Sequence, residues 1–236
     1  LKAISNFVKN HKQALMIADC VTSLGACNVP MDEWGIDVLA SGSQKGYMMP
    51  PGLSFVAMSK KAWAANSISN LPKFYLDLKL YKKTADKNSN PFTPSVNLYF
   101  ALEEALKMMK EEGLESIFKR HEIYKKATQE AMESIDLPLF AEKNYGSPSI
   151  TAIAPNNIDA EVIRKYVKNN FDILLAGGQD HLKGKIFRIG HLGFVNERDI
   201  IAAIGSIEAT LDQLGVATKP VGTGVGIASK ILMENK

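Results

Sequence analysis

One lysine stands in a context that could make its side-chain amine reactive. Lys45 follows the small polar residues Ser41-Gly-Ser-Gln44 and precedes the segment Met48-Met-Pro-Pro-Gly52. Small residues allow a tight turn, and consecutive prolines make it rigid. Apolar neighbours would desolvate the amine and make it nucleophilic. A lysine held in this way can form a Schiff base with an aldehyde, and a solvated loop lysine is the alternative.

A carboxylate closes an earlier apolar run of the chain. Asp19 follows Ala14-Leu-Met-Ile-Ala18, and Lys45 lies shortly after a second run, Ile36-Asp-Val-Leu-Ala40. Chemistry in parallel sheets gathers at the carboxyl ends of strands, so both side chains would lie at one edge. A carboxylate there can accept a hydrogen bond from a ring nitrogen and keep the ring protonated as an electron sink. Capping of the next turn is the alternative role for Asp19.

An arginine interrupts an apolar strand pattern in the second half of the chain. Arg188 lies within Ile186-Phe-Arg-Ile-Gly190. A guanidinium among apolar neighbours costs free energy unless its charge is paired. Its planar fork fits a substrate carboxylate, and a structural salt bridge is the alternative.

These residues depend on strands and helices that the sequence also predicts. The two runs named above and Leu53-Ser-Phe-Val-Ala-Met58 are apolar on both faces, which is typical of parallel strands covered by helices. Residues 74–81 form a weak helical pattern, and residues 86–94 are loop by composition. We therefore expect an α/β protein in which residues 1–112 form part of a large domain with a mainly parallel sheet.

Helical periodicity dominates from Ser95 onward. One helix is predicted to end at Gly113, with Tyr99, Leu102, Leu106 and Met109 on its apolar face. The elements expected after it are a helix from Leu114, a strand over 149–154, a helix from Asp159, short strands over 171–175 and 185–189, and a helix over 197–214. Residues 113–236 therefore read as a small α+β C-terminal domain.

The composition excludes several classes of protein. The 236 residues are 46% hydrophobic and 22% charged, which is ordinary for a folded chain and unlike a disordered one. A net charge of +3 gives no indication of a nucleic-acid or membrane-surface partner. No apolar run approaches the roughly 20 residues that span a bilayer. Cys20 and Cys27 support neither a zinc site nor a disulfide scaffold, so we expect reduced thiols in a cytoplasmic protein.

Four segments together resemble one protein family, the class V aminotransferases. They are Ala18-Asp-Cys-Val-Thr-Ser-Leu-Gly25, Gly35-Ile-Asp-Val-Leu-Ala-Ser-Gly-Ser-Gln-Lys45, Pro50-Pro-Gly52 and Phe187-Arg-Ile-Gly-His-Leu-Gly193. The branch most similar in appearance contains the alanine–glyoxylate, serine–glyoxylate and serine–pyruvate aminotransferases. The resemblance implies fold type I of the pyridoxal 5'-phosphate (PLP) enzymes. It also implies transamination between a small amino acid and a 2-oxo acid, and a homodimer with the active site at the subunit interface.

The resemblance assigns a role to each matching residue. Lys45 would hold PLP as a Schiff base and shuttle the proton, and Asp19 would pair with the pyridine nitrogen. Val21 would pack against the ring, and Gln44 would lie near the phosphate or the ring oxygen. The two remaining roles belong to Thr93, which would reach the phosphate of the neighbouring subunit, and Arg188, which would bind the α-carboxylate of the amino acid.

The chain departs from the family pattern in two ways. The family often has an aromatic hydroxyl three positions before the threonine, and Asn90 stands there. The family's upstream phosphate loop and ring-stacking aromatic residue cannot be located, so we expect the chain to be the C-terminal part of a longer enzyme. Two alternatives to an aminotransferase stay open: a cysteine desulfurase-like lyase, which usually has His where Gln44 stands, and a truncated subunit that serves in dimerisation or binds another polypeptide.

Other patterns receive ordinary structural interpretations. The segment Gly222-Thr-Gly-Val-Gly-Ile-Ala228 superficially resembles a dinucleotide fingerprint but follows no predicted strand. The pair Gly177-Gly178 is predicted to form a turn near the substrate arginine. His181 and His191 are expected to be polar residues without a catalytic role, because Lys45 already serves proton transfer, and no metal site is expected.

Overall fold

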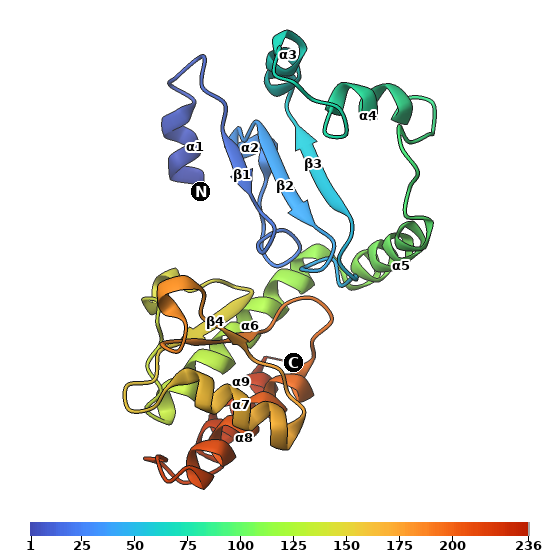
Figure 1. Ribbon diagram of the computed structural model, residues 1–236. Coiled ribbons are helices and arrows are strands. Elements are labelled where there is room, and N and C mark those ends of the chain that lie inside the picture. The colour runs from blue at the N-terminus through green and yellow to red at the C-terminus, as the bar shows by residue number, and fades with distance from the viewer. Residues whose placement is uncertain (236) are drawn as a thin grey trace. The chain divides into compact units, whose positions relative to one another are not determined.

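In the computed structural model, which describes residues 1–235, two parallel strands bring their carboxyl ends to one edge of a sheet. β1 (Ile17–Asp19) pairs with β2 (Val38–Gly42), and Asp19 lies opposite Ala40. β3 (Ser54–Met58) completes the order β1-β2-β3, as Figure 1 shows. Helices alternate with the strands of both sheets along the chain, so the predicted α/β class is confirmed.

The expectation that all three apolar runs form parallel strands is wrong for the third. β3 runs antiparallel to β2, with Val38 opposite Met58 and Gly42 opposite Ser54. Residues 43–53 are too few to cross over the sheet, because a parallel crossover needs about a dozen residues or more. The chain therefore turns back on itself, and Lys45 lies within this return.

A small apolar core supports β1 and β2. Its buried members are Met16, Ala18, Cys20, Ile36 and Leu39, and side chains from α1 (Lys2–Val8) and α2 (Met31–Trp34) pack against them. Cys20 is 1% exposed, so its thiol is a packing group of this core.

Three helices follow the sheet: α3 (Lys60–Ile68), α4 (Leu78–Ala85) and α5 (Val96–Glu112). α4 begins later than the helical pattern predicts, because the Asp77 side chain caps its first turn by accepting a hydrogen bond from the Lys79 N–H. The predicted apolar face of α5 is covered near its end at Met109, whereas Tyr99 and Leu106 are exposed.

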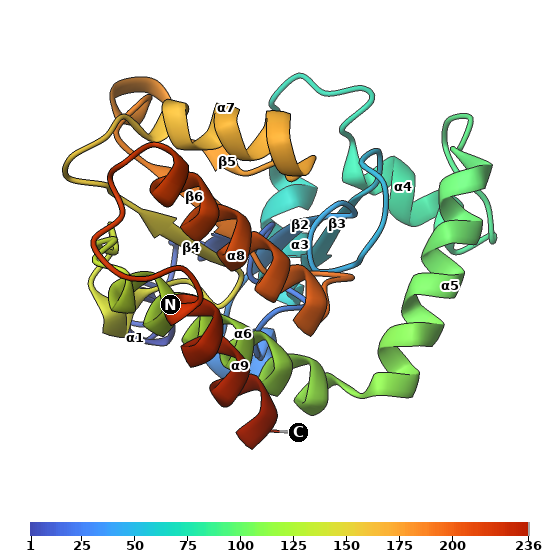
Figure 2. The same ribbon diagram turned by 90° about the horizontal axis from the view of Figure 1, so that it is seen from below.

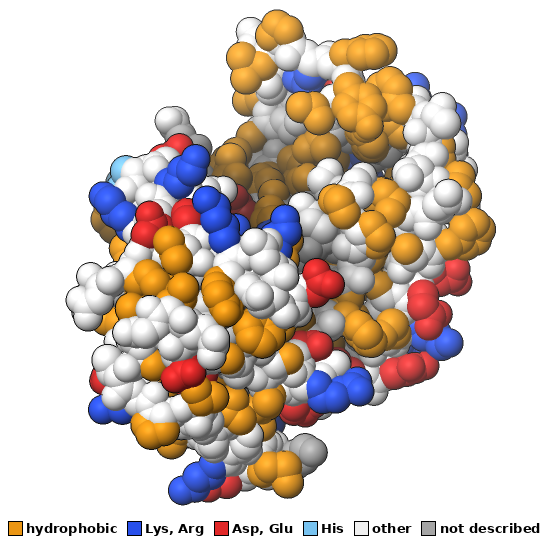
Figure 3. All heavy atoms as spheres, turned by 60° about the horizontal axis from the view of Figure 1, so that its bottom comes forward, with side chains coloured by type: hydrophobic (Ala, Val, Ile, Leu, Met, Phe, Trp, Pro, Cys, Tyr) orange, Lys and Arg blue, Asp and Glu red, His pale blue; other side chains and the backbone are white. Residues whose placement is uncertain are grey.

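The connection between α3 and α4 exposes an unusual number of apolar side chains. Ile68, Leu71, Phe74, Tyr75 and Leu76 are all exposed. Figure 3 shows hydrophobic side chains at the molecular surface, with large groups in the upper right of the view. Contiguous apolar surface on a folded chain marks an interaction site more often than chance exposure does.

The chain divides into two compact units. The first contains residues 1–24 and 28–111, and the second contains residues 25–27 and the chain from Glu112 onward. The second unit holds a sheet of order β4-β6-β5 with antiparallel pairs, made of β4 (Ile150–Ile153), β5 (Ala176–Gly177) and β6 (Phe187–Gly190). Its α-helices are α6 (Leu114–Ser134), α7 (Ala160–Phe171), α8 (Glu197–Gln213) and α9 (Thr223–Glu234). Short 3₁₀ turns span Lys143–Tyr145 and Asp180–Leu182.

The second unit confirms most of the predicted elements and corrects one. Residues 171–175 do not form a strand, because α7 continues to Phe171 and ends at Asp172 in the left-handed conformation. The strand of this region is β5, which begins at Ala176. The predicted helix over 197–214 is confirmed as α8, which Asn196 and Asp199 open with a reciprocal capping box.

The glycine-rich tail is a helix that the sequence reading did not predict. α9 lies against α6 and α8 (Figure 2), and a Cβ at Gly224 would lie 3.1 Å from the Ala131 carbonyl oxygen of α6. The buried Glu208 carboxylate accepts hydrogen bonds from the Gly224 N–H (2.7 Å) and the Val225 N–H (3.3 Å). A side-chain anion therefore occupies the helix N-terminus, and the glycines serve close packing.

Replacing Glu208 with Ala should destabilise the second unit, because two N–H groups at the start of α9 lose their acceptor. Loss of a helix cap costs about 0.5–2 kcal/mol, and a buried site lies at the upper end of that range. Chemical denaturation would measure the change in the free energy of unfolding. Glu122→Ala, which removes an exposed carboxylate of α6, is the control and should change it by less than about 0.5 kcal/mol. Equal effects of the two variants would contradict the capping role.

Candidate active site

The turn that carries Lys45 is closed by one buried serine. Ser43 has no exposed surface, and its hydroxyl donates to the Pro50 carbonyl (2.7 Å) and accepts from the Leu53 N–H (3.2 Å). Its backbone N–H donates to the Leu53 carbonyl (3.0 Å), and its carbonyl accepts from the Met49 N–H (3.2 Å). Ser43 at the start of the turn is thereby hydrogen-bonded to Met49, Pro50 and Leu53 near its end. Sequence reasoning quoted Ser43 within its motif but gave it no role.

Lys45 lies inside this closed turn with its amine unpaired. The backbone carbonyl of Lys45 accepts from the Met48 N–H (3.0 Å), and Met48 adopts the rare left-handed conformation with φ +62°. The Lys45 amine forms no hydrogen bond or ion pair with any residue of the described chain, 1–235. The side chain is half-buried, so the structure presents a free amine on a rigid turn.

Gln44 precedes this lysine and folds back over β2. Its side-chain oxygen lies 3.1 Å from the position that a Cβ on Gly42 would occupy. Any larger residue at Gly42 would displace the Gln44 amide. The glycine therefore leaves room for the amide at the carboxyl end of the strand.

Asp19 is the last residue of β1, on the strand that neighbours β2. One of its carboxylate oxygens, Oδ1, accepts the Val21 N–H at 3.0 Å, which orients the carboxylate. The other oxygen has no partner in the part of the chain that the structure describes. The bond from Val21 is the turn-capping role weighed from the sequence, and it leaves the second oxygen available. Val21 itself is half-buried directly beyond the strand end.

Thr93 is exposed and lies on the segment between α4 and α5, so neither parallel strand carries it. Nearby, the Tyr99 hydroxyl donates to the Asn90 side-chain oxygen at 3.0 Å, so this segment is tied to the first turn of α5. The role of Thr93 toward a phosphate of another subunit stays a prediction.

Arg188 occupies the central strand of the second sheet. Its Nε donates to the Gly177 carbonyl of β5 at 2.9 Å. The predicted turn at Gly177-Gly178 is wrong, because Gly177 ends the strand β5, although this glycine does lie beside the arginine. The two terminal guanidinium nitrogens have no partner within residues 1–235. The neighbours Phe187 and Ile189 are buried on the opposite face of β6. One bond thus orients the guanidinium, and its fork stays available for a carboxylate.

Two consecutive residues of α6 hold the turn that follows this strand. The Arg120 Nη1 donates to the Gly193 carbonyl (3.1 Å), and the His121 Nε2 accepts the Gly193 N–H (3.3 Å). Arg120 is itself held by Glu112 through bonds of 2.6 and 3.0 Å. Gly193 has φ +77°, a conformation that favours glycine. Sequence reasoning missed both α6 residues, because a long-range contact leaves no local pattern.

His191 and His121 form a buried, neutral pair. Burial lowers the pKa of His191 to about 4, and the nearby His121 and Lys125 add to this shift. Burial also lowers the pKa of His121. The Nε2 of His191 bonds the Thr151 hydroxyl at 2.9 Å, while its buried Nδ1 has no partner. These histidines therefore join the turn to the sheet and to α6, whereas His181 is exposed.

Two residues of the first unit have the chemistry to hold a pyridoxal ring, one at its aldehyde and one at its ring nitrogen. A free amine at Lys45 suits an aldehyde, and an unpaired carboxylate oxygen at Asp19 suits a protonated ring nitrogen. Asp19 ends β1 and Lys45 follows β2, and these two strands are adjacent and parallel. Within residues 1–235 no helix is long and apolar enough to cross a membrane, and no cluster of three or more His, Cys, Asp or Glu could hold a metal ion.

Comparison with known proteins agrees with these features. Residues 1–193 match the family described as class V aminotransferases. The chain belongs to this family.

Individual relatives carry two kinds of name. A protein of Synechococcus sp. (strain PCC 6716) called soluble hydrogenase, small subunit, is 59% identical over 98% of this chain and 60% of its own length. A serine–glyoxylate aminotransferase of Methylorubrum extorquens is 37% identical over 94% of this chain and 57% of its own length. The crystal structure of ureidoglycine–glyoxylate aminotransferase from Bacillus subtilis superimposes with a TM-score of 0.91 at 28% identity. The superposition covers 99% of this chain and 61% of the Bacillus subtilis chain. This chain therefore spans about 60% of the length of such relatives.

Replacing Ser43 with Ala should loosen the turn of Lys45. The Pro50 carbonyl and the Leu53 N–H would each lose a partly buried hydrogen bond, at a cost of about 1–3 kcal/mol in the free energy of unfolding. Ser41→Ala is a matched control, because the Ser41 hydroxyl makes a single long bond of 3.4 Å to the Cys20 carbonyl. Denaturation curves would compare the two variants. The assignment of Ser43 is wrong if Ser41→Ala costs as much.

The buried His191 predicts that stability falls in mild acid. Its pKa is about 4 in the folded chain and about 6.5 when exposed, so only the unfolded chain binds a proton between these values. The free energy of unfolding should therefore decrease as the pH falls from about 6.5 to about 4, by on the order of a few kcal/mol.

His191→Gln should flatten this pH dependence, because glutamine can bond Thr151 but does not titrate. His181→Gln, which removes an exposed imidazole, should leave it unchanged. Denaturation midpoints from pH 4 to 8 would measure both variants. An unchanged slope in His191→Gln would assign the acid sensitivity to other groups.

Proposed function

We propose that this chain supplies the covalent lysine and the substrate arginine of a PLP-dependent aminotransferase. The reaction would exchange an amino group between a small amino acid, such as alanine or serine, and a 2-oxo acid, such as glyoxylate or pyruvate. The observation that carries the proposal is the free Lys45 amine on a turn closed by Ser43, next to the strand that ends at Asp19. Relatives named as glyoxylate aminotransferases support the choice of substrates.

The residues divide the work of the reaction between them. PLP, when bound, supplies the electron sink for the carbanion that forms at the amino acid Cα. The Asp19 carboxylate holds the proton on the ring nitrogen, so the sink stays effective. The Lys45 Nζ would hold the cofactor, and its amine would take the α-proton of the amino acid and hold it for return. General base assistance of this kind contributes about 10²–10⁴-fold.

Arg188 would orient the substrate through its carboxylate. The bond from its Nε to the Gly177 carbonyl fixes the plane of the guanidinium, so its terminal nitrogens can make two parallel bonds at little entropic cost. Gln44 and Val21 would contact the cofactor from the strand ends, and Thr93 would bind the phosphate of a neighbouring subunit.

We also propose a cytoplasmic homodimer. Five exposed apolar side chains within residues 68–76 support a subunit interface in the first unit, because water-exposed apolar surface of this kind favours association. Thr93 is exposed as well, which suits a contact across subunits.

Two features argue against the desulfurase alternative. Gln44 stands where those enzymes usually have histidine, and Cys20 is buried in the core of the first unit, where its thiol cannot reach a substrate. The remaining alternative is a non-catalytic subunit that binds another polypeptide, which the name of the Synechococcus relative favours. A yellow, borohydride-sensitive chromophore distinguishes the two, because only the aminotransferase requires it.

Lys45→Ala should abolish turnover in the complete protein, because no other amine lies on this turn. Borohydride should no longer link PLP to the polypeptide, and mass spectrometry of the reduced protein measures that link. Lys12→Ala, an exposed lysine of the same unit, is the control and should keep both properties. Appreciable steady-state transamination by Lys45→Ala would refute the assignment.

Arg188→Ala should weaken substrate binding and spare the cofactor. A charge-assisted hydrogen bond contributes about 1.5–3 kcal/mol, so KM or kcat/KM should change about 10–100-fold. Arg188→Lys should restore only part of this loss, because an ammonium lacks the fork. Half-reaction kinetics with alanine and the absorbance of bound PLP separate the two effects. A variant that loses PLP but keeps its substrate affinity would contradict this role.

A further inference from the structure

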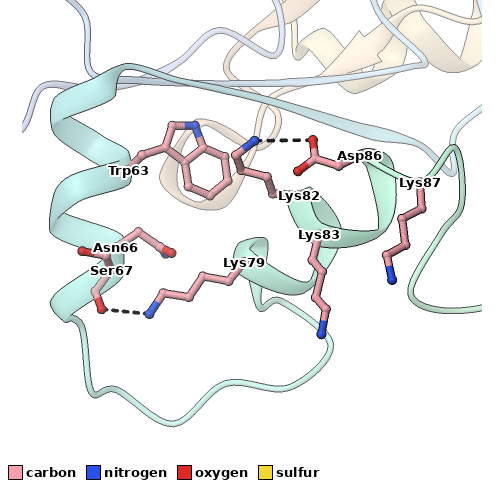
Figure 4. A pocket seen from close by; sticks show the side chains of 8 residues that line it. All are labelled: Trp63, Asn66, Ser67, Lys79, Lys82, Lys83, Asp86 and Lys87. Atoms are coloured by element: carbon pink, nitrogen blue, oxygen red, sulfur yellow. Dashed lines mark hydrogen bonds and ion pairs between the residues drawn. The ribbon is translucent and has the colours of Figure 1, made fainter.

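A hollow of about 620 Å³ lies between α3 and α4, and none of the residues proposed for transamination lines it. The first unit alone forms it, and Figure 4 shows its walls. The lining residues are Trp63, Asn66 and Ser67 from α3, and Lys79, Lys82, Lys83, Asp86 and Lys87 from α4 and the turn after it.

The hollow carries an excess of positive charge. Four of the eight lining residues are lysines, and Asp86 is the only acid among them. Lys79 donates to the Ser67 carbonyl (2.9 Å), and Lys82 pairs with Asp86 at 3.5 Å. Lys83 and Lys87, one helical turn apart, have no hydrogen-bond or ion-pair partner in the described chain, and their side chains extend in the same direction (Figure 4). Such a surface attracts anions.

Helix electrostatics explain only part of this cluster. Lys82 and Lys83 lie in the last turn of α4, where the partial negative charge of the helix end stabilises cations. That effect acts along the helix axis. It leaves the ammonium groups of Lys83 and Lys87 free to contact an external anion. Lysine is a common ligand for phosphate groups.

Two uncharged features of the same hollow point to a ligand that is more than an inorganic anion. The side chains of Trp63 and Asn66 project from α3 toward α4 (Figure 4). The Asn66 Oδ1 is buried and has no hydrogen-bond donor within residues 1–235. Buried acceptors are nearly always satisfied, so this oxygen suits a hydroxyl or amino group of a ligand. An indole face suits a flat aromatic ring, which stacks on it.

We propose that the hollow between α3 and α4 binds a nucleoside polyphosphate. The base would stack on Trp63, a ribose hydroxyl or base amino group would donate to the Asn66 Oδ1, and the phosphates would contact Lys83 and Lys87. An inorganic polyphosphate would satisfy only the lysines, and a neutral nucleoside only Trp63 and Asn66. The proposal does not depend on transamination, because none of its residues serves that reaction.

Tryptophan fluorescence provides a direct test, because the chain has only two tryptophans, Trp34 and Trp63. ATP should quench the emission of the full chain in a saturable manner, with PLP present throughout, and added salt should weaken binding. Trp63→Phe should abolish the quenching while calorimetry still detects ATP. Adenosine and inorganic triphosphate should each bind at least about tenfold more weakly than ATP. Absence of saturable ATP binding overturns the proposal.

Variants separate a built site from general charge attraction. The double variant Lys83→Gln/Lys87→Gln should weaken ATP binding at least about tenfold. The control Lys107→Gln/Lys110→Gln removes the same charge from exposed positions of α5 and should leave the affinity unchanged. Equal losses in both variants, or triphosphate affinity equal to that of ATP, would show that charge alone acts there and would refute nucleotide recognition. Lys45→Ala should keep the affinity, which distinguishes this test from that of transamination.

Discussion

The proposed chemistry of the first unit depends on the buried hydroxyl and peptide groups of Ser43. Eleven residues must leave β2, present a lysine and return as β3, and an unsupported loop of that length would sample many conformations. Four hydrogen bonds from one residue remove that freedom at Pro50, Leu53 and Met49. Because Ser43 is inaccessible to water, each of these bonds is costly to break. The amine of Lys45 is therefore held by backbone geometry and needs no side-chain partner.

The second unit uses a related arrangement for its arginine. A single bond orients the Arg188 guanidinium, while Arg120 and His121 bind the carbonyl and the N–H of Gly193 on the following turn. The histidine can accept that N–H only while its Nε2 carries no proton, and burial keeps it neutral. Polar groups outside the proposed chemistry thus hold the turn after the strand that presents Arg188.

Two places in the chain resemble anion sites, and they differ in whether the protein supplies its own counter-charge. They are the glycine-rich start of α9 and the lysine cluster between α3 and α4. At the start of α9 the protein's own Glu208 carboxylate takes the N–H groups that a phosphate would need, so the glycine-rich segment is structural. Between α3 and α4 no protein carboxylate within residues 1–235 pairs with Lys83 or Lys87. The Glu208 carboxylate therefore occupies the N-terminus of α9, whereas Lys83 and Lys87 stay available to an external anion.

The sequence by itself determined the α/β class and most helices, because these follow from local periodicity and composition. It also singled out Asp19, Lys45 and Arg188 as candidate site residues, because each is a charged residue next to or within an apolar run. It also indicated the family, because four short motifs can be recognised without any knowledge of the fold. Only the tertiary structure decided that β3 runs antiparallel, that residues 171–175 complete a helix end, and that α9 covers α6. It alone showed the contacts of Ser43, Arg120, His121 and Glu208. Those contacts join residues distant in the chain, or depend on burial, and neither leaves a periodic signal in the sequence.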